Sequence, residues 1–280
     1  MLTISNRTTV KHVGLFNRAI KSPPVSAPVR YFVPGQYGRR CSPINISITG
    51  FGNVGSTIAE ILLHDRFSQH YHYHINIVEP NVSTSQYGKV LDFMQATTIH
   101  HRHHSFTLNS EEAYLNADYI VHTANIVGGK IKSDRMELLA ANKELSKALF
   151  ANKNFSNPNL KVIMLSNPLD IITYYTREFA NLPAQNVVGT GTYLDEMRMK
   201  YYIKEKLAVA DHFDVNCSVL GEHGPNIVPL FDSANLSDLR VDGPSTTPLY
   251  INSEMRGELT ALVVNAASML RFVVFLSISV

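Results

Sequence analysis

Tryptophan is absent from this 280-residue chain, and cysteine occurs only twice, at Cys41 and Cys217. Two cysteines cannot build a disulfide scaffold, so a reducing compartment is the default expectation. Charge is also sparse: charged residues are 17% of the chain, and a formal net charge of +2 does not indicate a nucleic-acid partner. Hydrophobic residues make up 45%, which excludes a disordered protein and indicates a globular one with an ample core.

Acidic residues are missing from the N-terminal region, where no Asp or Glu precedes Glu60 although Arg and Lys recur. Four prolines between residues 23 and 34 prevent a long helix there. We interpret residues 1–43 as a basic N-terminal extension, either disordered or draped over the surface. The alternative is an organelle transit peptide, which has this arginine-rich, acid-poor composition. A cytoplasmic location is therefore expected, with an organelle matrix as the alternative.

A long uncharged hydrophobic run is also missing. The candidate for a membrane segment, Leu259 to Val280, is interrupted by Asn265 and Arg271. A central arginine costs about 2.5–3.5 kcal/mol on insertion scales, so membrane insertion is not expected. We interpret this segment as a buried helix that runs into an apolar, strand-like tail.

Short β-branched runs alternate with stretches of helical periodicity along residues 44–193. Strands are predicted at 44–48, 74–79, 119–121 and 161–165; helices are predicted after residue 55, at 84–98 and from about residue 134. The third of these helices is expected to bury Leu138, Ala141, Leu145 and Leu149. This alternation predicts an α/β fold with a Rossmann-type, doubly wound parallel sheet.

A glycine cluster directly follows the first predicted strand and precedes a helix. In a dinucleotide fingerprint Gly50 would allow the tight turn, Gly52 would let the backbone approach the pyrophosphate, and Gly55 would let helix pack on strand. Glu79 ends the second strand, where a carboxylate would bind the ribose hydroxyls and repel a 2′-phosphate. The segment therefore predicts an NAD site and disfavours NADP; the alternative is a glycine-rich turn without a ligand.

Three further residues have the chemistry of an acid–base site that binds a carboxylic acid. Asp195 and Arg198 are three residues apart, so on a helix they project from one face. His223 lies in a loop between glycines, where a substrate could approach closely. A histidine titrates near neutral pH, a carboxylate can orient it, and arginine offers a planar fork for a carboxylate. The alternative for each residue is a purely structural role: His223 as a loop histidine, and Asp195 with Arg198 as a surface ion pair.

These motifs, together with Ser166-Asn167-Pro168, resemble the lactate/malate dehydrogenase superfamily from about Ile44 to about Asn265. The resemblance implies that His223 is the acid–base residue and that Asp195 orients it. It also implies that Arg198 clamps the substrate carboxylate, that Asn167 bonds the substrate oxygen, and that Arg135 closes over the substrate on a mobile loop and polarises its carbonyl.

The resemblance further implies the cofactor contacts and the assembly. The residues expected to contact NAD are Gly50, Gly52, Asn53, Val54, Gly55, Glu79, Thr123, Ala124, Asn125, Asn142 and Asn167. Residues 44–193 would form the NAD-binding domain, and 194–280 an incomplete α+β substrate domain. Homo-oligomers, either dimers or tetramers, are expected.

The substrate is less well defined by the sequence. In the family, the residue six positions before the loop arginine is commonly glutamine in lactate enzymes and arginine in malate enzymes, and here it is Gly129. Lys130 or Lys132 could pair with a second carboxylate, whereas Gly128 and Gly129 leave room for an alkyl group. Other segments resemble the lactate branch, including hydroxyisocaproate-type members. The prediction is an L-2-hydroxy acid dehydrogenase acting on a monocarboxylic acid, with malate as the alternative.

The C-terminal region departs from the family pattern. The expected threonine near a Lys-Gly turn and the long terminal helix are not recognisable after His223. The substrate domain is therefore interpreted as truncated, and a catalytically impaired NAD-binding relative is carried as the alternative of another class.

Two histidine-rich runs, 70–74 and 100–104, raise the possibility of a metal site. Neither has a cysteine or a suitable set of carboxylates nearby. We expect a solvated polar surface and no metal.

Overall fold

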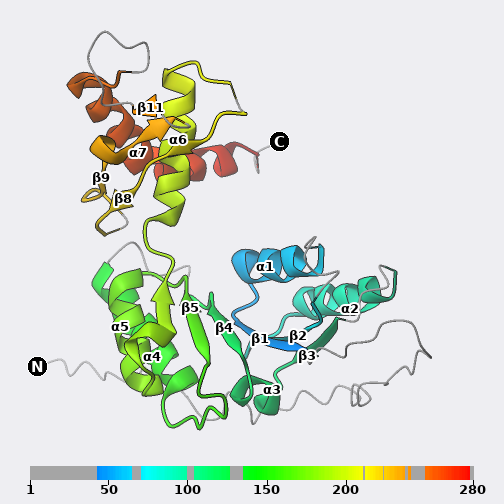
Figure 1. The fold of residues 1–280 in the computed structure, drawn as a ribbon. Coiled ribbons are helices and arrows are strands. Elements are labelled where there is room, and N and C mark those ends of the chain that lie inside the picture. The colour runs from blue at the N-terminus through cyan, green and yellow to red at the C-terminus, as the bar shows by residue number, and fades with distance from the viewer. Residues whose placement is uncertain are drawn as a thin grey trace, which may run out of the picture. The chain divides into compact units, whose positions relative to one another are not determined.

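The computed structural model describes residues 43–64, 71–99, 104–126, 135–210, 212–222, 224–236, 239–240 and 250–277. The predicted basic extension at 1–43 lies outside the described residues except for its last position. The chain divides into two compact units between Gly189 and Thr190. Each unit has hydrophobic core residues of its own, and Figure 1 labels the elements of both.

The first unit is built on a six-stranded parallel sheet with the order β3-β2-β1-β4-β5-β6. Its strands are β1 (Ile44–Thr49), β2 (Tyr73–Val78), β3 (Ser105–Leu108), β4 (Tyr119–His122), β5 (Lys161–Met164) and β6 (Val187–Gly189). Strand order reverses between β1 and β4, which pair in parallel from Ile46–Tyr119 to Thr49–His122. In such sheets ligands bind beyond the carboxyl ends of the strands at this switch point. The predicted doubly wound fold is confirmed.

Helices cover both faces of this sheet (Figure 1). They are α1 (Asn53–His64), α2 (Thr84–Ile99), α3 (Glu111–Leu115), α4 (Arg135–Phe150) and α5 (Leu169–Ala180), followed by a 3₁₀ turn, η2 (Ala184–Asn186). Neighbouring strand residues point to opposite faces. Ile120 accordingly joins the core with Leu149 and Ile172, while Val121 joins the core with Ala59 and Val90.

The buried face of α4 differs from the predicted one. Leu149 is buried as expected, but Leu138, Ala141 and Leu145 are only half-buried. The helix instead buries two polar residues, Asn142 at 1% exposure and Ser146 at 0%. Ser146 can occupy the core because its Oγ lies 2.5 Å from the hydroxyl of Thr176 on α5, which satisfies both groups. Leu145 still packs against this core from its half-buried position, so the apolar stripe identified the packed side of the helix but not the polar residues within it.

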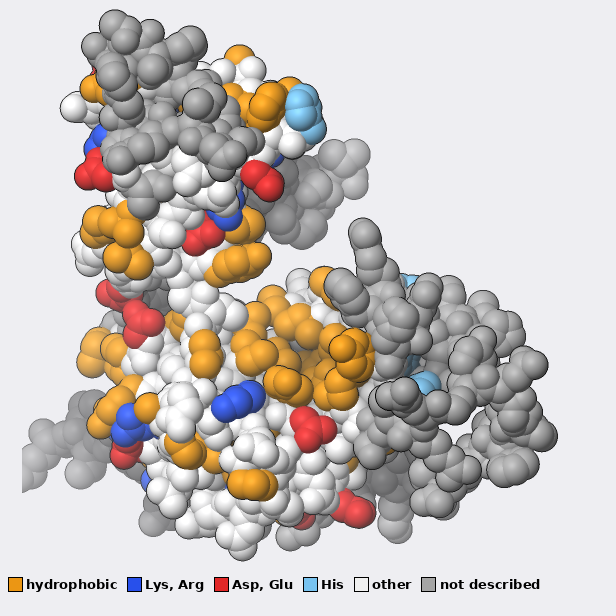
Figure 2. Space-filling view, viewed as in Figure 1, with side chains coloured by type: hydrophobic (Ala, Val, Ile, Leu, Met, Phe, Trp, Pro, Cys, Tyr) orange, Lys and Arg blue, Asp and Glu red, His pale blue; other side chains and the backbone are white. Residues whose placement is uncertain are grey.

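α1 also differs from its simple periodicity. Ile58 and Leu62 pack against the core, whereas Ile61 is 60% exposed and Val54 is 52% exposed. Hydrophobic side chains gather on the face of the first unit that Figure 2 shows. The helix buries Ala59 and Leu63, while the side chains of Ile61 and Val54 remain exposed, so part of its apolar surface lies outside the core.

The second unit is α+β, as predicted. Its elements are α6 (Tyr193–Lys206), β7 (Val215–Asn216), β8 (Val219–Leu220), β9 (Val228–Pro229), η3 (Phe231–Ser233), β10 (Asn235–Leu236), β11 (Leu239–Arg240) and α7 (Ser253–Ser277). The strands form one three-stranded and one two-stranded antiparallel sheet. α6 and α7 share a core that includes Met199, Ile203 and Leu259.

The strand-like tail predicted after Arg271 is wrong as far as Ser277, because α7 continues through this segment. β-branched and aromatic composition is a weak guide where tertiary or helical context overrides it. Among the described residues, the structure has no helix long and apolar enough to cross a membrane.

A histidine lies wholly buried at the end of β4. The Nδ1 atom of His122 is 2.6 Å from the Thr49 hydroxyl, and its ring meets Phe150 edge-on with centroids 5.6 Å apart. Its Nε2 finds no hydrogen-bond partner within the described part of the chain. Burial in this apolar surrounding lowers the pKa of His122 from 6.5 to about 4, so the imidazole is neutral at pH 7.

This burial makes the free energy of unfolding depend on pH. Because the folded-state pKa lies below the unfolded value, the contribution is fully present above pH 6.5 and is lost as pH falls from 6.5 towards 4. Between pH 6.5 and 5, this histidine should lower the free energy of unfolding of the parent protein by about 2 kcal/mol. His122→Gln should therefore show a pH-dependent decrease that is smaller by this amount, measured by urea unfolding at both pH values. The exposed His212 provides the control: His212→Gln should leave the pH dependence as in the parent, and equal slopes in all three proteins would contradict the assignment.

Candidate functional site

The glycine loop joins β1 to α1 at the switch point. Gly50 has φ +85°, and a Cβ there would lie 2.5 Å from the Ala124 Cα. A Cβ on Gly55 would lie 2.0 Å from the Gly50 carbonyl oxygen. Both positions therefore require glycine for backbone packing. Gly52, by contrast, has no atom within 4 Å of the point that a Cβ would occupy, so it leaves open space beside the backbone.

Glu79 lies one residue beyond β2 and contacts this loop. Its Oε2 accepts a hydrogen bond from the Phe51 backbone N–H at 3.0 Å, and its Oε1 accepts one from Asn81 N–H at 3.3 Å. The side-chain amide of Asn109 binds both backbone groups of Glu79: Oδ1 accepts from the Glu79 N–H at 2.8 Å, and Nδ2 donates to the Glu79 C=O at 2.9 Å. A half-buried carboxylate is thus fixed at the edge of the glycine loop.

These features fit NAD. The open space at Gly52 is what a backbone needs to approach a pyrophosphate, and the first turn of α1 presents N–H groups that have no acceptor within the helix. Glu79 places a negative charge where ribose hydroxyls need an acceptor. Asn53 and Val54, also expected at the cofactor, are exposed at the start of this helix.

The segments after β4 and β5 are tied together through α4. Thr123 donates from Oγ1 to the carbonyls of Thr49 and Gly50, at 3.0 and 2.9 Å. Asn142 accepts from Ile126 N–H at 2.8 Å through Oδ1. Its Nδ2 donates both to the Asn167 carbonyl, at 2.6 Å, and to the Asn125 side chain. The structure therefore brings together Asn125, Asn142 and Asn167.

The backbone around Asn167 has two more constraints. The Asn167–Pro168 peptide is cis, and the neighbouring Ser166 hydroxyl donates to the Ala124 carbonyl. Ala124 in turn is the residue that Gly50 approaches. The ends of β1, β4 and β5 are consequently connected at the switch point, by close backbone approach and by hydrogen bonds from side-chain hydroxyls to carbonyls.

In the second unit, Asp195 and Arg198 lie on one face of α6, as their spacing predicts. Arg198 Nη1 donates to Asp195 Oδ1 at 3.3 Å. Asp195 is 2% exposed, and the Arg198 side chain is 15% exposed. The pair is therefore sheltered from water, unlike the surface ion pair that such spacing usually produces. A carboxylate this deeply buried needs charged or hydrogen-bonding partners.

Two expected site residues are not placed by the structure. His223 and the loop 127–134 lie outside the described residues, and of Arg135 only the backbone at the start of α4 is described. The glycines on either side of His223 have positive φ angles, +96° at Gly221 and 149° at Gly224. The loop around this histidine therefore uses conformations that favour glycine.

The prediction that the two histidine-rich runs form a solvated surface is wrong for two of their described residues, His74 and His104. His104 is 6% exposed, stacks on Tyr73 and accepts from its N–H through Nδ1 at 3.1 Å. His74 is half-buried between hydroxyls of Ser105 and Thr107. Both are held where β2 and β3 pair, by hydrogen bonds to residues of the neighbouring segment. No group of three or more metal-binding side chains occurs in the described part of the chain.

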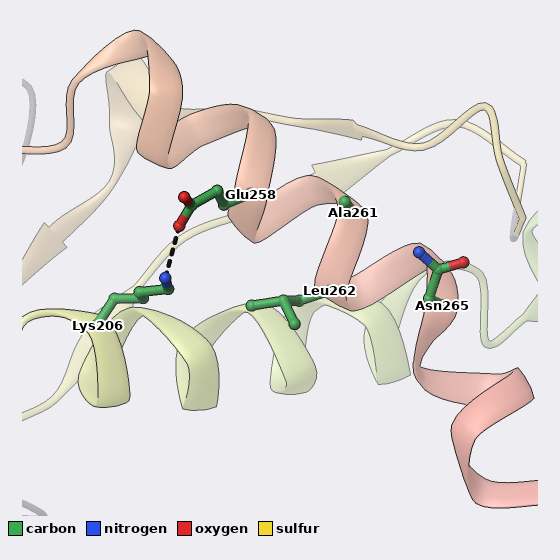
Figure 3. Close-up of a pocket in the computed structure, with 5 residues that line it drawn as sticks. All are labelled: Lys206, Glu258, Ala261, Leu262 and Asn265. Carbon is green, nitrogen blue, oxygen red and sulfur yellow. Dashed lines mark hydrogen bonds and ion pairs between the residues drawn. The ribbon is translucent and has the colours of Figure 1, made fainter. Parts of the chain in front are cut away.

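A groove with a volume of about 360 Å³ lies in the second unit between α6 and α7 (Figure 3). Its lining is the Lys206–Glu258 ion pair together with Ala261, Leu262 and Asn265. None of these residues belongs to the predicted acid–base set. The groove is therefore not the expected substrate site.

Gln86 also contacts the site, although the sequence did not predict it there: its Nε2 donates to the Phe51 carbonyl at 2.9 Å. A signal was present, because Ser83 followed three residues later by glutamine is the pattern of a helix capping box. That pattern indicates the start of α2 but not the contact with the glycine loop.

Comparisons with known proteins agree on one family. A protein-family model, that of the lactate/malate dehydrogenase NAD binding domain, matches residues 44–189 of this chain. A malate dehydrogenase of Aliarcobacter butzleri is 32% identical over 197 residues, covering 70% of this chain and 61% of that protein. An L-lactate dehydrogenase of Clostridium perfringens is 30% identical over 224 residues, covering 79% and 68%. The matches thus span about three fifths to two thirds of these relatives.

Solved structures give the same result. Lactate dehydrogenase from Eimeria maxima with NADH and oxamate aligns with TM-score 0.69 and 26% identity, covering 85% of this chain and 70% of that one. Malate dehydrogenase from Plasmodium falciparum aligns with TM-score 0.69 and 26% identity, covering 81% and 71%.

The match extends over the switch-point loop, Glu79 and the strand ends described above, and it includes relatives of both names. The chain belongs to the lactate/malate dehydrogenase family of NAD-dependent oxidoreductases, and its first unit is the NAD-binding domain.

Proposed function

We propose that the protein is an NAD-dependent L-2-hydroxy acid dehydrogenase that interconverts a 2-keto acid and an L-2-hydroxy acid. The observation that carries this proposal is the sheltered Asp195–Arg198 pair on α6. In a chain with an NAD-binding first unit, it offers a fixed carboxylate and a guanidinium suited to an organic acid. Glycines with positive φ on both sides of His223 add support, because they suit a loop that a substrate approaches.

In the proposed reaction, bound NADH supplies the hydride, and the residues of the chain bind the acid and move a proton. His223 gives a proton to the keto oxygen in the reducing direction and takes it back in the other. Asp195 stabilises the charged imidazole and fixes its tautomer. Arg198 binds the substrate carboxylate through two N–H groups.

Arg135 and Asn167 complete the proposed site at the substrate oxygen. Arg135 adds positive charge where the alkoxide develops, and the Asn167 side chain donates a hydrogen bond to it. The contacts of Asn142 to Asn125 and to the Asn167 carbonyl support this role, because they fix the Asn167 backbone. The expected NAD contacts of Thr123, Ala124 and Asn125 follow from their position beyond β4.

The proposed substrate is a monocarboxylic acid, lactate or a branched analogue. Gly128 and Gly129 leave room for an alkyl group, which favours this choice. Lys130 and Lys132 favour malate as the second candidate, and the relatives carry both names. The competing hypothesis is a catalytically impaired relative that binds NADH but turns over no keto acid.

Domain division, location and assembly are proposed on the same basis. The division into residues 1–43, 44–193 and 194–280, a cytoplasmic location and a homodimer or homotetramer all follow from the sequence and the family resemblance. The exposed Ile61 and Val54 on α1 support assembly, because apolar side chains gathered on one face favour a partner surface.

Turnover tests the proposed function directly. NADH oxidation followed at 340 nm should proceed with pyruvate or 2-ketoisocaproate at a higher kcat/KM than with oxaloacetate. His223→Asn should abolish turnover while leaving NADH binding intact, because it removes the proton donor alone. A preference for oxaloacetate would instead identify a malate enzyme. Binding of NADH without turnover of any keto acid would reject the dehydrogenase.

Replacement of Arg198 tests the substrate clamp. Lysine keeps the charge but cannot form two parallel N–H contacts, so Arg198→Lys should raise the KM for the keto acid by about tenfold or more. The control is Lys206→Arg at the other end of α6, where the ion pair with Glu258 can persist. Steady-state kinetics with an unchanged KM in Arg198→Lys would exclude a bidentate role.

Glu79 is expected to set the choice between the two nicotinamide cofactors. Glu79→Gln keeps an oxygen that can accept from Phe51 N–H but removes the charge that repels a 2′-phosphate. The ratio of NADPH to NADH affinity should rise by about tenfold, measured by fluorescence titration. Glu60→Gln, an exposed change on α1, should leave this ratio unchanged. If Glu79→Gln also leaves it unchanged, the carboxylate does not face the ribose.

A further inference from the structure

Phe51, the residue inside the glycine loop, has its peptide groups held from two sides. Its N–H donates to Glu79 Oε2 at 3.0 Å, and its C=O accepts from Gln86 Nε2 at 2.9 Å. The ring is also fixed: it is 2% exposed and meets Phe93 edge-on, with centroids 6.2 Å apart. The loop is therefore tied both to the end of β2 and to α2.

Gln86 performs two separate tasks with one amide group. The Gln86 side-chain Oε1 accepts from the Ser83 backbone N–H at 2.8 Å, and the Gln86 backbone N–H donates to Ser83 Oγ at 3.2 Å. These two bonds form a reciprocal capping box at the start of α2. This leaves Nε2 for the Phe51 carbonyl. A glutamate at this position would cap the helix equally well but could not donate to Phe51.

The loop needs such a tie because of its glycines. Gly50 and Gly52 flank Phe51 and permit conformations that other residues rarely adopt, so the free loop has many alternatives. Binding a pyrophosphate requires one of them, in which the N–H groups after Phe51 converge on the ligand. A contact that fixes the loop beforehand lowers the entropic cost of binding.

We propose that Gln86 is a positioning residue for NAD, which holds the pyrophosphate-binding loop in its binding conformation through the Phe51 carbonyl. It acts through Phe51 and does not contact the cofactor. The inference rests on NAD binding by the first unit and is independent of the proposed substrate and turnover. Ser83, Gln86 and Phe51 thus connect the start of α2 to the cofactor loop.

The test compares NADH affinity in two variants of the full chain by fluorescence titration. Gln86→Glu keeps the shape of the side chain and the acceptor of the capping box but removes the donor to Phe51. Its Kd for NADH should rise about fivefold, the central value for the loss of one neutral hydrogen bond, and by at least threefold. Ser83→Ala is the matched control: it weakens the helix cap, lowers Tm and should change the Kd by less than threefold.

Two further measurements separate the proposed role from other effects. The titration is repeated at 0.5 M NaCl, because direct repulsion between the new carboxylate and the pyrophosphate would be screened there. Amide hydrogen exchange over residues 50–55 of the unliganded protein should increase in Gln86→Glu and not in Ser83→Ala, which reports loop order without any ligand.

The outcomes are distinct. A Kd increase of at least threefold that persists at high salt, with faster exchange in the loop, supports the inference. A smaller increase, an increase that disappears at 0.5 M NaCl, unchanged exchange, or an equal rise in Ser83→Ala overturns it. Absence of turnover with keto acids would reject the proposed function and leave this result as it stands.

Discussion

The close approach of backbone atoms at the switch point is the constraint on which the first unit depends. Gly55 packs against the Gly50 carbonyl and Gly50 packs against Ala124, at separations that leave no room for a Cβ. The Thr123 hydroxyl adds hydrogen bonds to the carbonyls of Thr49 and Gly50. α1 can therefore begin directly above β1 and beside the end of β4. The N–H groups of its first turn then face the crevice that the strand order creates.

Polar residues complete this arrangement from within the core. Asn142 uses Oδ1 and both hydrogens of its amide to join the segments after β4 and β5, and Asn76 of β2 bonds Ser110 through both its oxygen and its nitrogen. Each such group avoids the cost of burial without a partner. They specify the positions of loops that apolar contacts alone would leave free. Order at the candidate site thus depends on a few buried amides as well as on the hydrophobic core.

Part of this structure could be predicted from residue patterns because the information is local. The strands at 44–49, 73–78 and 161–164 and the helix at 84–99 follow from apolar periodicity, and the glycine spacing predicted the turn, the open position and the helix packing. The helix predicted from about residue 134 is confirmed as α4 and buries Leu149, but full burial of Leu138, Ala141 and Leu145 was a wrong prediction. The strand-like tail predicted after Arg271 was wrong as far as Ser277. On α4, the contact between Ser146 and Thr176 on α5 puts a polar residue in the core. After Arg271, the chain is helical as far as Ser277, although its β-branched and aromatic composition is typical of a strand.

The sequence by itself determined the fold class, through the order of strands and helices, and the family, through the resemblance of its motifs. It also determined the cofactor and the shared helix face of Asp195 and Arg198, because these depend on the spacing of residues along short segments. Only the tertiary structure decided that His122 is buried and neutral, that Asn142 joins Asn125 to Asn167, and that Gln86 holds Phe51. These contacts join residues 17 to 73 positions apart, brought together when parallel strands pair and helices cross their ends. No local pattern encodes which amide or hydroxyl meets which partner, because that is fixed by how the elements pack.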